Sequence, residues 1–165
     1  MSYFNKFPYI AYSLDEGQTR FIIRDIFRRV KADQAGIQGD LAYYDYDIRD
    51  GDTPEILADK IYDNPLLHWV ILITNEIIDP RWDWPLPENI LYDYIVDKYG
   101  LANIGNAHHY INSAGYTVNS TAPGAIAVSN YDYETEENEK KRRIKILKPQ
   151  HVNVFVKSFT EIAAQ

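Results

Sequence analysis

Histidine is the residue type in this chain best suited to acid–base or metal chemistry, and the four histidines are poorly spaced for either. His68 and His151 stand apart from each other, while His108 and His109 are adjacent. The adjacent pair has no acidic or histidine partner at a metal-ligand spacing. We therefore expect a solvated pair on a small hairpin and no metal site. The chain has no cysteine, which excludes thiolate metal sites and disulfides.

Motifs of the common enzyme classes are absent from the sequence. It contains no Gly-rich phosphate loop and no Gly-x-Ser-x-Gly nucleophile elbow. Glycoside hydrolysis needs two opposed carboxyl groups in a cleft, and nothing in the sequence selects such a pair among the many carboxylates. We therefore predict no catalytic residues, no cofactor and no enzymatic activity.

Composition and charge restrict the classes of partner. The formal net charge of −7 argues against nucleic acid, because phosphate contacts require clustered positive charge. Residues 40–64 carry eight acids and two bases, whereas residues 20–31 carry five bases and one acid. The 14 tyrosines suit either an interface or a Tyr-rich core and sheet. No signal peptide is evident, and the longest apolar run, residues 69–73, is too short to span a bilayer, so we expect a soluble, non-secreted protein without a membrane partner.

The N-terminal region is predicted to be an arm followed by a helix. Residues 1–15 mix aromatic residues with Pro8 and favour an extended arm. Residues 20–31 have the apolar spacing of a helix about three turns long. One face would carry Ile22, Ile23, Ile26, Phe27 and Val30, with Arg20, Arg24 and Arg28 beside it. Gly36 and Gly39 mark a break after this helix.

A strand, a tight turn and two capped helices are predicted next. Residues 41–49 favour a strand. Gly51 permits a positive φ in the turn, and either Asp52 or Thr53 could cap the helix that begins near Pro54. Asn64 followed by Pro65 repeats the arrangement of cap and helix start. The second helix should run to about residue 75.

The remainder of the chain predicts a loop, a helix, a hairpin, a strand and a C-terminal helix. The loop, residues 76–87, contains Trp82 and Trp84, which either cover the core or form an exposed docking patch. A helix should extend from residue 87 to a stop at Gly100, and residues 109–111 and 116–118 suggest a hairpin. Residues 143–147 favour a strand. Val152, Phe155, Val156 and Phe159 indicate the C-terminal helix.

Residues 44–75 resemble a LysM module. The matching residues are the strand 44–48, the turn Gly51-Asp52-Thr53, and Leu57-Ala58, Ile61-Tyr62 and Asn64-Pro65. The resemblance implies a β-α-α-β core with antiparallel strands, and 143–147 is the candidate second strand. The expected fold is therefore α+β, with an N-terminal arm and helix (1–40), a LysM-like core (41–75 and 141–148), a long insertion (76–140) and a C-terminal helix (149–165).

Three blocks of sequence are similar to one family, the small LysM-like baseplate wedge subunit of contractile-tailed bacteriophages of the T-even type. The blocks are residues 25–30, residues 54–65 with Trp69, Val70 and Asn75, and residues 137–146; the middle block is the most specific. The resemblance implies a wedge component of the virion tail baseplate, assembled in the host cytoplasm and present in several copies, about six, around the tail tube. It would clamp neighbouring wedge proteins to each other near the hub or tube.

Partner contacts are expected from apolar and basic side chains of the arm, the Trp-rich loop and the C-terminal helix. The candidates are Arg24, Ile26, Phe27, Arg28, Trp82, Trp84, Phe155 and Phe159. The runner-up function is a LysM carbohydrate-binding domain that recognises peptidoglycan or chitin. A tail-associated lysozyme-like enzyme is a third, minor possibility. The missing export signal, the single copy of the motif and the long insertion argue against the carbohydrate-binding reading.

Overall fold

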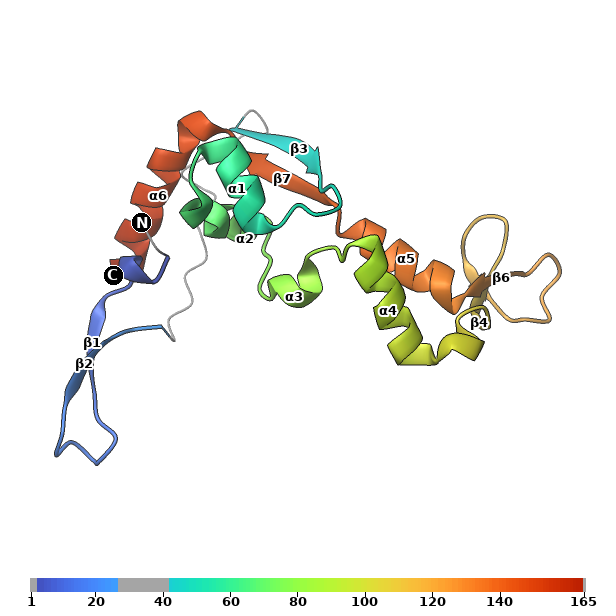
Figure 1. The fold of residues 1–165 in the computed structure, drawn as a ribbon, viewed down its shortest axis with the longest axis horizontal. Coiled ribbons are helices and arrows are strands. Elements are labelled where there is room, and N and C mark those ends of the chain that lie inside the picture. Colours follow the sequence, from blue (N-terminus) through green and yellow to red (C-terminus); the bar gives the residue numbers. More distant parts are fainter. Residues whose placement is uncertain (1–2, 27–41, 165) are drawn as a thin grey trace. The chain divides into compact units, whose positions relative to one another are not determined.

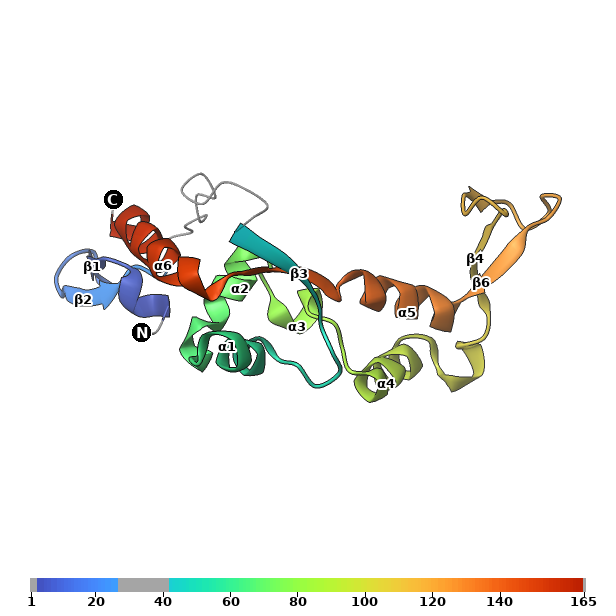
Figure 2. The ribbon, with the colours of Figure 1, turned by 90° about the horizontal axis from the view of Figure 1, so that it is seen from above.

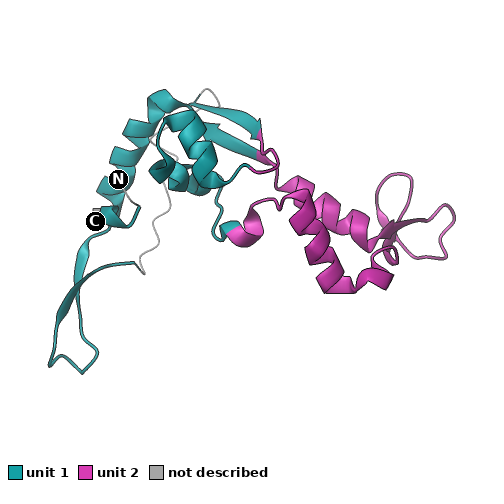
Figure 3. Ribbon diagram, viewed as in Figure 1, with its two compact units in different colours: residues 1–46, 52–80, 144–165 teal, residues 47–51, 81–143 magenta. Residues whose placement is uncertain are grey.

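The computed structural model describes residues 3–26 and 42–164. They form an α+β fold in which helices accompany two two-stranded sheets and one three-stranded sheet. The chain divides into two compact units, shown in Figure 3. Unit 1 comprises residues 1–46, 52–80 and 144–165, and unit 2 comprises residues 47–51 and 81–143.

The described N-terminal segment of unit 1 is a short 3-10 turn followed by a β-hairpin. The turn η1 covers Tyr3–Lys6, and the antiparallel strands β1 (Tyr9–Tyr12) and β2 (Phe21–Arg24) follow it. The helix predicted for residues 20–31 is therefore wrong where β2 lies. Phe21, Ile22 and Ile23 are aromatic and β-branched residues that favour strands, and β1 supplies the cross-strand partner that the apolar spacing did not reveal. The rest of that predicted helix beyond residue 26, and the break at residues 36–39, lie outside the described residues.

The predicted pairing of the two distant strands is confirmed. Strand β3 (Tyr43–Asp47) is hydrogen-bonded to β7 (Arg143–Leu147). The Ile48 amide donates to the Arg142 carbonyl over 2.9 Å, and the Lys148 amide donates to the Ala42 carbonyl over 2.9 Å. Residue numbers thus rise along one strand as they fall along its partner, so the pair is antiparallel.

Two capped helical segments follow β3. Gly51 has φ +84°, as the turn prediction requires. Thr53, and not Asp52, caps α1 (Pro54–Tyr62) by accepting a hydrogen bond from the Ile56 amide. Asn64 caps the 3-10 turn η4 (Pro65–Leu67) by accepting a bond from the Leu66 amide, and α2 (His68–Thr74) follows. The sequence signals for both helix starts are therefore confirmed.

The core of unit 1 forms where α2, β7 and the C-terminal helix α6 (Pro149–Ala164) meet (Figures 1 and 2). Trp69 of α2 stacks obliquely on Phe159 of α6, with ring centroids 4.8 Å apart. Phe7 packs edge-on against Phe159. The Tyr62 hydroxyl donates to the Leu147 carbonyl over 3.0 Å, and burial raises the pKa of this tyrosine. The C-terminal helix predicted from residues 152–159 is confirmed.

Unit 2 contains two helices and a small sheet, and α3 (Pro80–Asp83) lies at its boundary. Helix α4 spans Glu88–Tyr99 and ends at Gly100, as predicted, before the turn η5 (Leu101–Asn103). Strand β4 (Ala107–Ile111) pairs with β5 (Thr117–Val118), which confirms the predicted hairpin. Strand β6 (Ile126–Ser129) pairs with the other edge of β4 and leads into α5 (Asn130–Lys140). Neither β6 nor α5 was predicted.

Buried polar side chains tie α5 to the rest of unit 2. The Asn138 side-chain amide bridges both backbone groups of Leu86, with bonds of 2.8 and 3.0 Å. The Glu134 carboxylate accepts hydrogen bonds from the Lys98 ammonium and the Tyr99 hydroxyl, each at 2.7 Å. Burial alone would raise the pKa of Glu134, but these two donors lower it below its ordinary value. These contacts explain why α5, which contains few apolar side chains, is nevertheless held as a helix.

Candidate interaction surfaces

The histidine pair lies on β4, where its rings are engaged by protein groups. The His108 ring stacks on the Tyr133 ring at a centroid distance of 3.8 Å, and the two histidine Nδ1 atoms are 3.0 Å apart. Within the described ranges, no group of three or more His, Cys, Asp or Glu side chains is placed to hold a metal ion. The histidines therefore give no geometric support for a metal centre.

The β1–β2 hairpin, located in Figure 1, exposes several large apolar side chains according to their accessible areas. Side chains alternate between the two faces of a strand, so the exposed residues occupy both faces. We call this set the hairpin surface: Tyr9, Tyr12, Leu14, Phe21, Ile22 and Ile26. Ile22 is 78% exposed and Ile26 is 56% exposed. Of the predicted contact residues in this region, Ile26 thus lies on an open surface, whereas Phe27 and Arg28 lie outside the described residues.

Arg24 has a role inside the chain. Its guanidinium donates to the Phe7 carbonyl over 2.5 Å and to the Asn5 carbonyl over 3.2 Å, and it lies 4.0 Å from the centroid of the Tyr9 ring. These contacts tie the base of the hairpin to the segment that enters the unit 1 core. The Arg24 guanidinium is thus engaged within the protein, and its contact with a partner stays a prediction.

The two tryptophans of the Pro-rich loop have opposite environments. Trp84 is 7% exposed and belongs to the interior. Trp82 is 61% exposed on α3, and it meets the Tyr94 ring edge-on at 6.4 Å. The sequence left open whether these tryptophans belong to the core or to a docking patch. Trp84 belongs to the core and Trp82 is exposed, so only Trp82 remains a candidate contact residue.

Phe155 and Phe159 are buried in the unit 1 core. They are 4% and 1% exposed, and both pack against the Trp69 ring. The expectation that they face other subunits is corrected: the apolar side of α6 is covered by η1, α2 and β7 of the same chain. The helical spacing of these residues was read correctly, but spacing does not identify what covers an apolar face.

Asp52 has a buried role that the capping motif did not predict. Its carboxylate accepts a hydrogen bond from the Tyr46 hydroxyl at 2.8 Å and pairs with the Lys60 ammonium at 2.5 Å. The Asp52 side chain is almost fully buried, whereas that of Lys60 is more than half exposed. Asp52 therefore links β3 to α1, while the neighbouring Thr53 supplies the cap.

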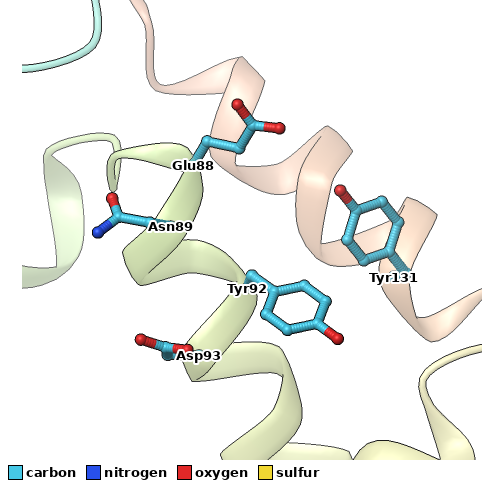
Figure 4. Close-up of a pocket in the computed structure, with 5 residues that line it drawn as sticks. All are labelled: Glu88, Asn89, Tyr92, Asp93 and Tyr131. Atoms are coloured by element: carbon cyan, nitrogen blue, oxygen red, sulfur yellow. The ribbon is translucent and has the colours of Figure 1, made fainter.

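An open hollow of about 370 Å³ lies between α4 and α5 in unit 2 (Figure 4). It is lined by Glu88, Asn89, Tyr92 and Asp93 of α4 and by Tyr131 of α5. Glu88 and Tyr92 are four residues apart on one helix, as are Asn89 and Asp93, so they form two adjacent rows. We call this hollow the α4–α5 groove. The sequence did not indicate this groove, because α5, which provides its second wall, was not predicted.

Comparison with known proteins decides the family. The family described as base plate wedge protein 53 matches residues 1–124 of this chain. The chain belongs to this family. The matched range includes the β1–β2 hairpin, both capped helical segments and α4, and it ends between β5 and β6.

A relative in the base plate wedge protein 53 family supports the same assignment over nearly the whole length. The baseplate wedge protein gp53 of Enterobacteria phage T4 is 27% identical over 186 aligned residues. The alignment covers 98% of this chain and 94% of the relative. The resemblance identified from the three sequence blocks is thereby confirmed.

Across the described residues, no helix has the length and apolar character needed to cross a bilayer.

Proposed function

We propose that this protein is a structural, non-enzymatic subunit of the baseplate wedge in a contractile phage tail. It clamps neighbouring wedge proteins to one another around the hub or tube, in several copies per baseplate, and is incorporated during assembly in the host cytoplasm. Family membership supports the assignment to the wedge. The hairpin surface supports the clamp.

The hairpin surface is the main observation in support of the proposed clamp function. An isolated two-stranded hairpin is marginally stable in water, and one with apolar side chains on both faces gains little from its own strands. Contact with another protein would bury these side chains and contribute roughly 25 cal/mol per Å² of apolar area. The outer strand edges also present backbone groups to which a partner strand could bind. A hairpin of this kind is suited to insertion between subunits.

The compact part of unit 1 is the base from which the hairpin extends. We interpret β3, α1, α2 and β7 as a LysM-like module, which is supported by their β-α-α-β order and by the antiparallel pairing of the two strands. Arg24 and η1 connect the hairpin to this base. In the proposal, the module holds the hairpin in place and exposed Trp82 provides a second apolar contact.

The proposal is tested with Ile22→Asp, and Ile78→Asp is the matched control. Ile22 and Ile78 are 78% and 76% exposed, so each change adds one charge to an open surface. Both variants should keep the melting temperature of the isolated protein nearly unchanged. In reconstitution with the other wedge proteins, Ile22→Asp should reduce incorporation at least about tenfold, whereas Ile78→Asp should incorporate normally.

Two further measurements keep this test decisive. Ile22→Thr retains a β-branched strand residue while removing most of the apolar contact, and it should also impair incorporation. Normal incorporation of both Ile22 variants would overturn the clamp. Retention of the wild-type protein on peptidoglycan or chitin would instead favour the carbohydrate-binding alternative, so that pull-down is run in parallel.

A further inference from the structure

The α4–α5 groove combines acidic and aromatic side chains whose carboxylates and hydroxyls have no ion-pair or hydrogen-bond partner among the described residues. Glu88 and Tyr92 project from α4 toward α5, and Tyr131 faces them from the first turn of α5 (Figure 4). Within residues 3–26 and 42–164, the carboxylates of Glu88 and Asp93 form no ion pair. The hydroxyls of Tyr92 and Tyr131 make no hydrogen bond within the same residues.

The carboxylates of Glu88 and Asp93 on α4, unpaired among the described residues, contrast with the acidic groups of α5, which are all engaged. Glu134 is held by Lys98 and Tyr99, Glu136 and Glu137 pair with Lys140, and Glu139 pairs with Arg142. A negative charge at the start of α4 is favourable beside the helix N-terminus, which accounts for Glu88. It does not account for Asp93, one turn further on, or for the two tyrosine rings that complete the groove.

We propose that the α4–α5 groove binds an arginine side chain from a basic segment of another wedge protein. A guanidinium group is planar, stacks on tyrosine rings and donates paired hydrogen bonds to carboxylates, so it matches the rings and the acids together. The hollow is at the small end of the range of ligand pockets, about 300–1,000 Å³, which suits one side chain better than a larger ligand. The choice of a wedge protein as the source rests on the proposed function.

The direct test is binding of an acetylated triarginine amide to the full-length protein, followed by NMR. The ring resonances of Tyr92 and Tyr131 should shift on titration. Glu88→Gln combined with Asp93→Asn removes both charges and keeps the side-chain shapes, and it should weaken binding about tenfold. The matched control is Glu55→Gln with Asp59→Asn on α1, which makes the same change in net charge at exposed positions of unit 1.

The control separates a specific site from general attraction to an acidic protein. Equal weakening by the two double variants, or ring resonances that do not move, would overturn the proposal. Tyr92→Leu supplies a second criterion, because it removes the stacking surface and keeps the helix-forming tendency. It should abolish the preference for triarginine over an acetylated trilysine amide, and an unchanged preference would also count against the groove.

Failure of this proposal and failure of the proposed function give different results. If the peptide does not bind while Ile22→Asp blocks incorporation into the wedge, the groove proposal fails and the clamp remains. If the peptide binds but the wild-type protein is not incorporated into wedges, the groove recognises arginine and the assignment of its source is wrong.

Discussion

Helix α6 and the β1–β2 hairpin both belong to unit 1 and both carry phenylalanine and branched aliphatic residues, yet their surroundings differ. Phe155 and Phe159 of α6 are covered by α2, η1 and β7, whereas Phe21 and Ile22 of the hairpin are at least half exposed. The difference shows that apolar content alone does not identify a core. The presence of covering elements within the same chain decides whether a segment stabilises the fold or remains available to a partner.

The sharpest test of this comparison is a matched pair of Phe→Ala changes. Phe159→Ala removes a fully buried ring and should lower the free energy of unfolding by about 3–5 kcal/mol. Phe21→Ala removes a half-exposed ring that pairs across the hairpin with Tyr12, and it should cost less than about 1 kcal/mol. Urea unfolding followed by tryptophan fluorescence measures both. Similar losses would mean that the hairpin belongs to the folded core.

A medium-sized effect is expected at the turn that joins β3 to α1. Gly51 has φ +84°, and a Cβ added there would meet no atom within 4 Å, so strain in the backbone is the only cost of a side chain. Gly51→Val should therefore destabilise the protein by about 1–3 kcal/mol, with Gly51→Asn milder.

Gly105 provides the control for this turn. It also has open space around its Cβ position, but its φ is not in the left-handed region. Gly105→Val should cost less than about 1 kcal/mol in the same denaturant assay. Equal costs for Gly51→Val and Gly105→Val would show that the turn between β3 and α1 does not require a positive φ at Gly51.

The smallest effect is expected at the tip of the hairpin, which is held by polar contacts. Hydrogen bonds from Thr19 and Ser13 lower the pKa of Asp15 to about 2. The ionised form is thus favoured in the folded loop, so its stabilisation is complete above the ordinary aspartate pKa of about 3.9 and is lost as pH falls through about 2. NMR titration of the Asp15 carboxyl group should give the lowered midpoint, and Asp15→Asn should loosen the tip without changing the melting of the core. An ordinary midpoint would contradict the loop geometry.

Local signals in the sequence predicted the central part of the fold well. Gly51 and Asn64 each specify a turn or a cap through their own side chain or lack of one, and the structure confirms both. Of the two cap candidates before α1, Asp52 and Thr53, the structure selects Thr53. The pairing of residues 43–49 with 142–147 was also predicted, because the resemblance to a LysM module required a second strand and residues 143–147 were the best candidate for it.

The remaining elements depend on partners outside their own segment of sequence. Residues 21–24 have apolar spacing that fits a helix or a strand, and only pairing with β1 decides for the strand. Helix α5 has little apolar periodicity, since its buried contacts are made by Asn130, Glu134 and Asn138. The α4–α5 groove could not be predicted for the same reason. The exposure of Trp82 and the burial of Trp84 likewise follow from packing that two similar residues in one loop do not reveal.

The pairing of β3 with β7 also determines the order in which the protein can become complete on the ribosome. Residues 81–143 hold all the strands and helices of the β4–β6 sheet, α4 and α5, so those elements can associate before translation ends. Helix α2 cannot bury its apolar side until then, because β7 and α6 cover that side and emerge last. A chain that terminates prematurely before residue 143 would leave Trp69 and Val70 without their cover and would be exposed to proteases and chaperones. Only finished polypeptides would then enter the pool from which wedges are built.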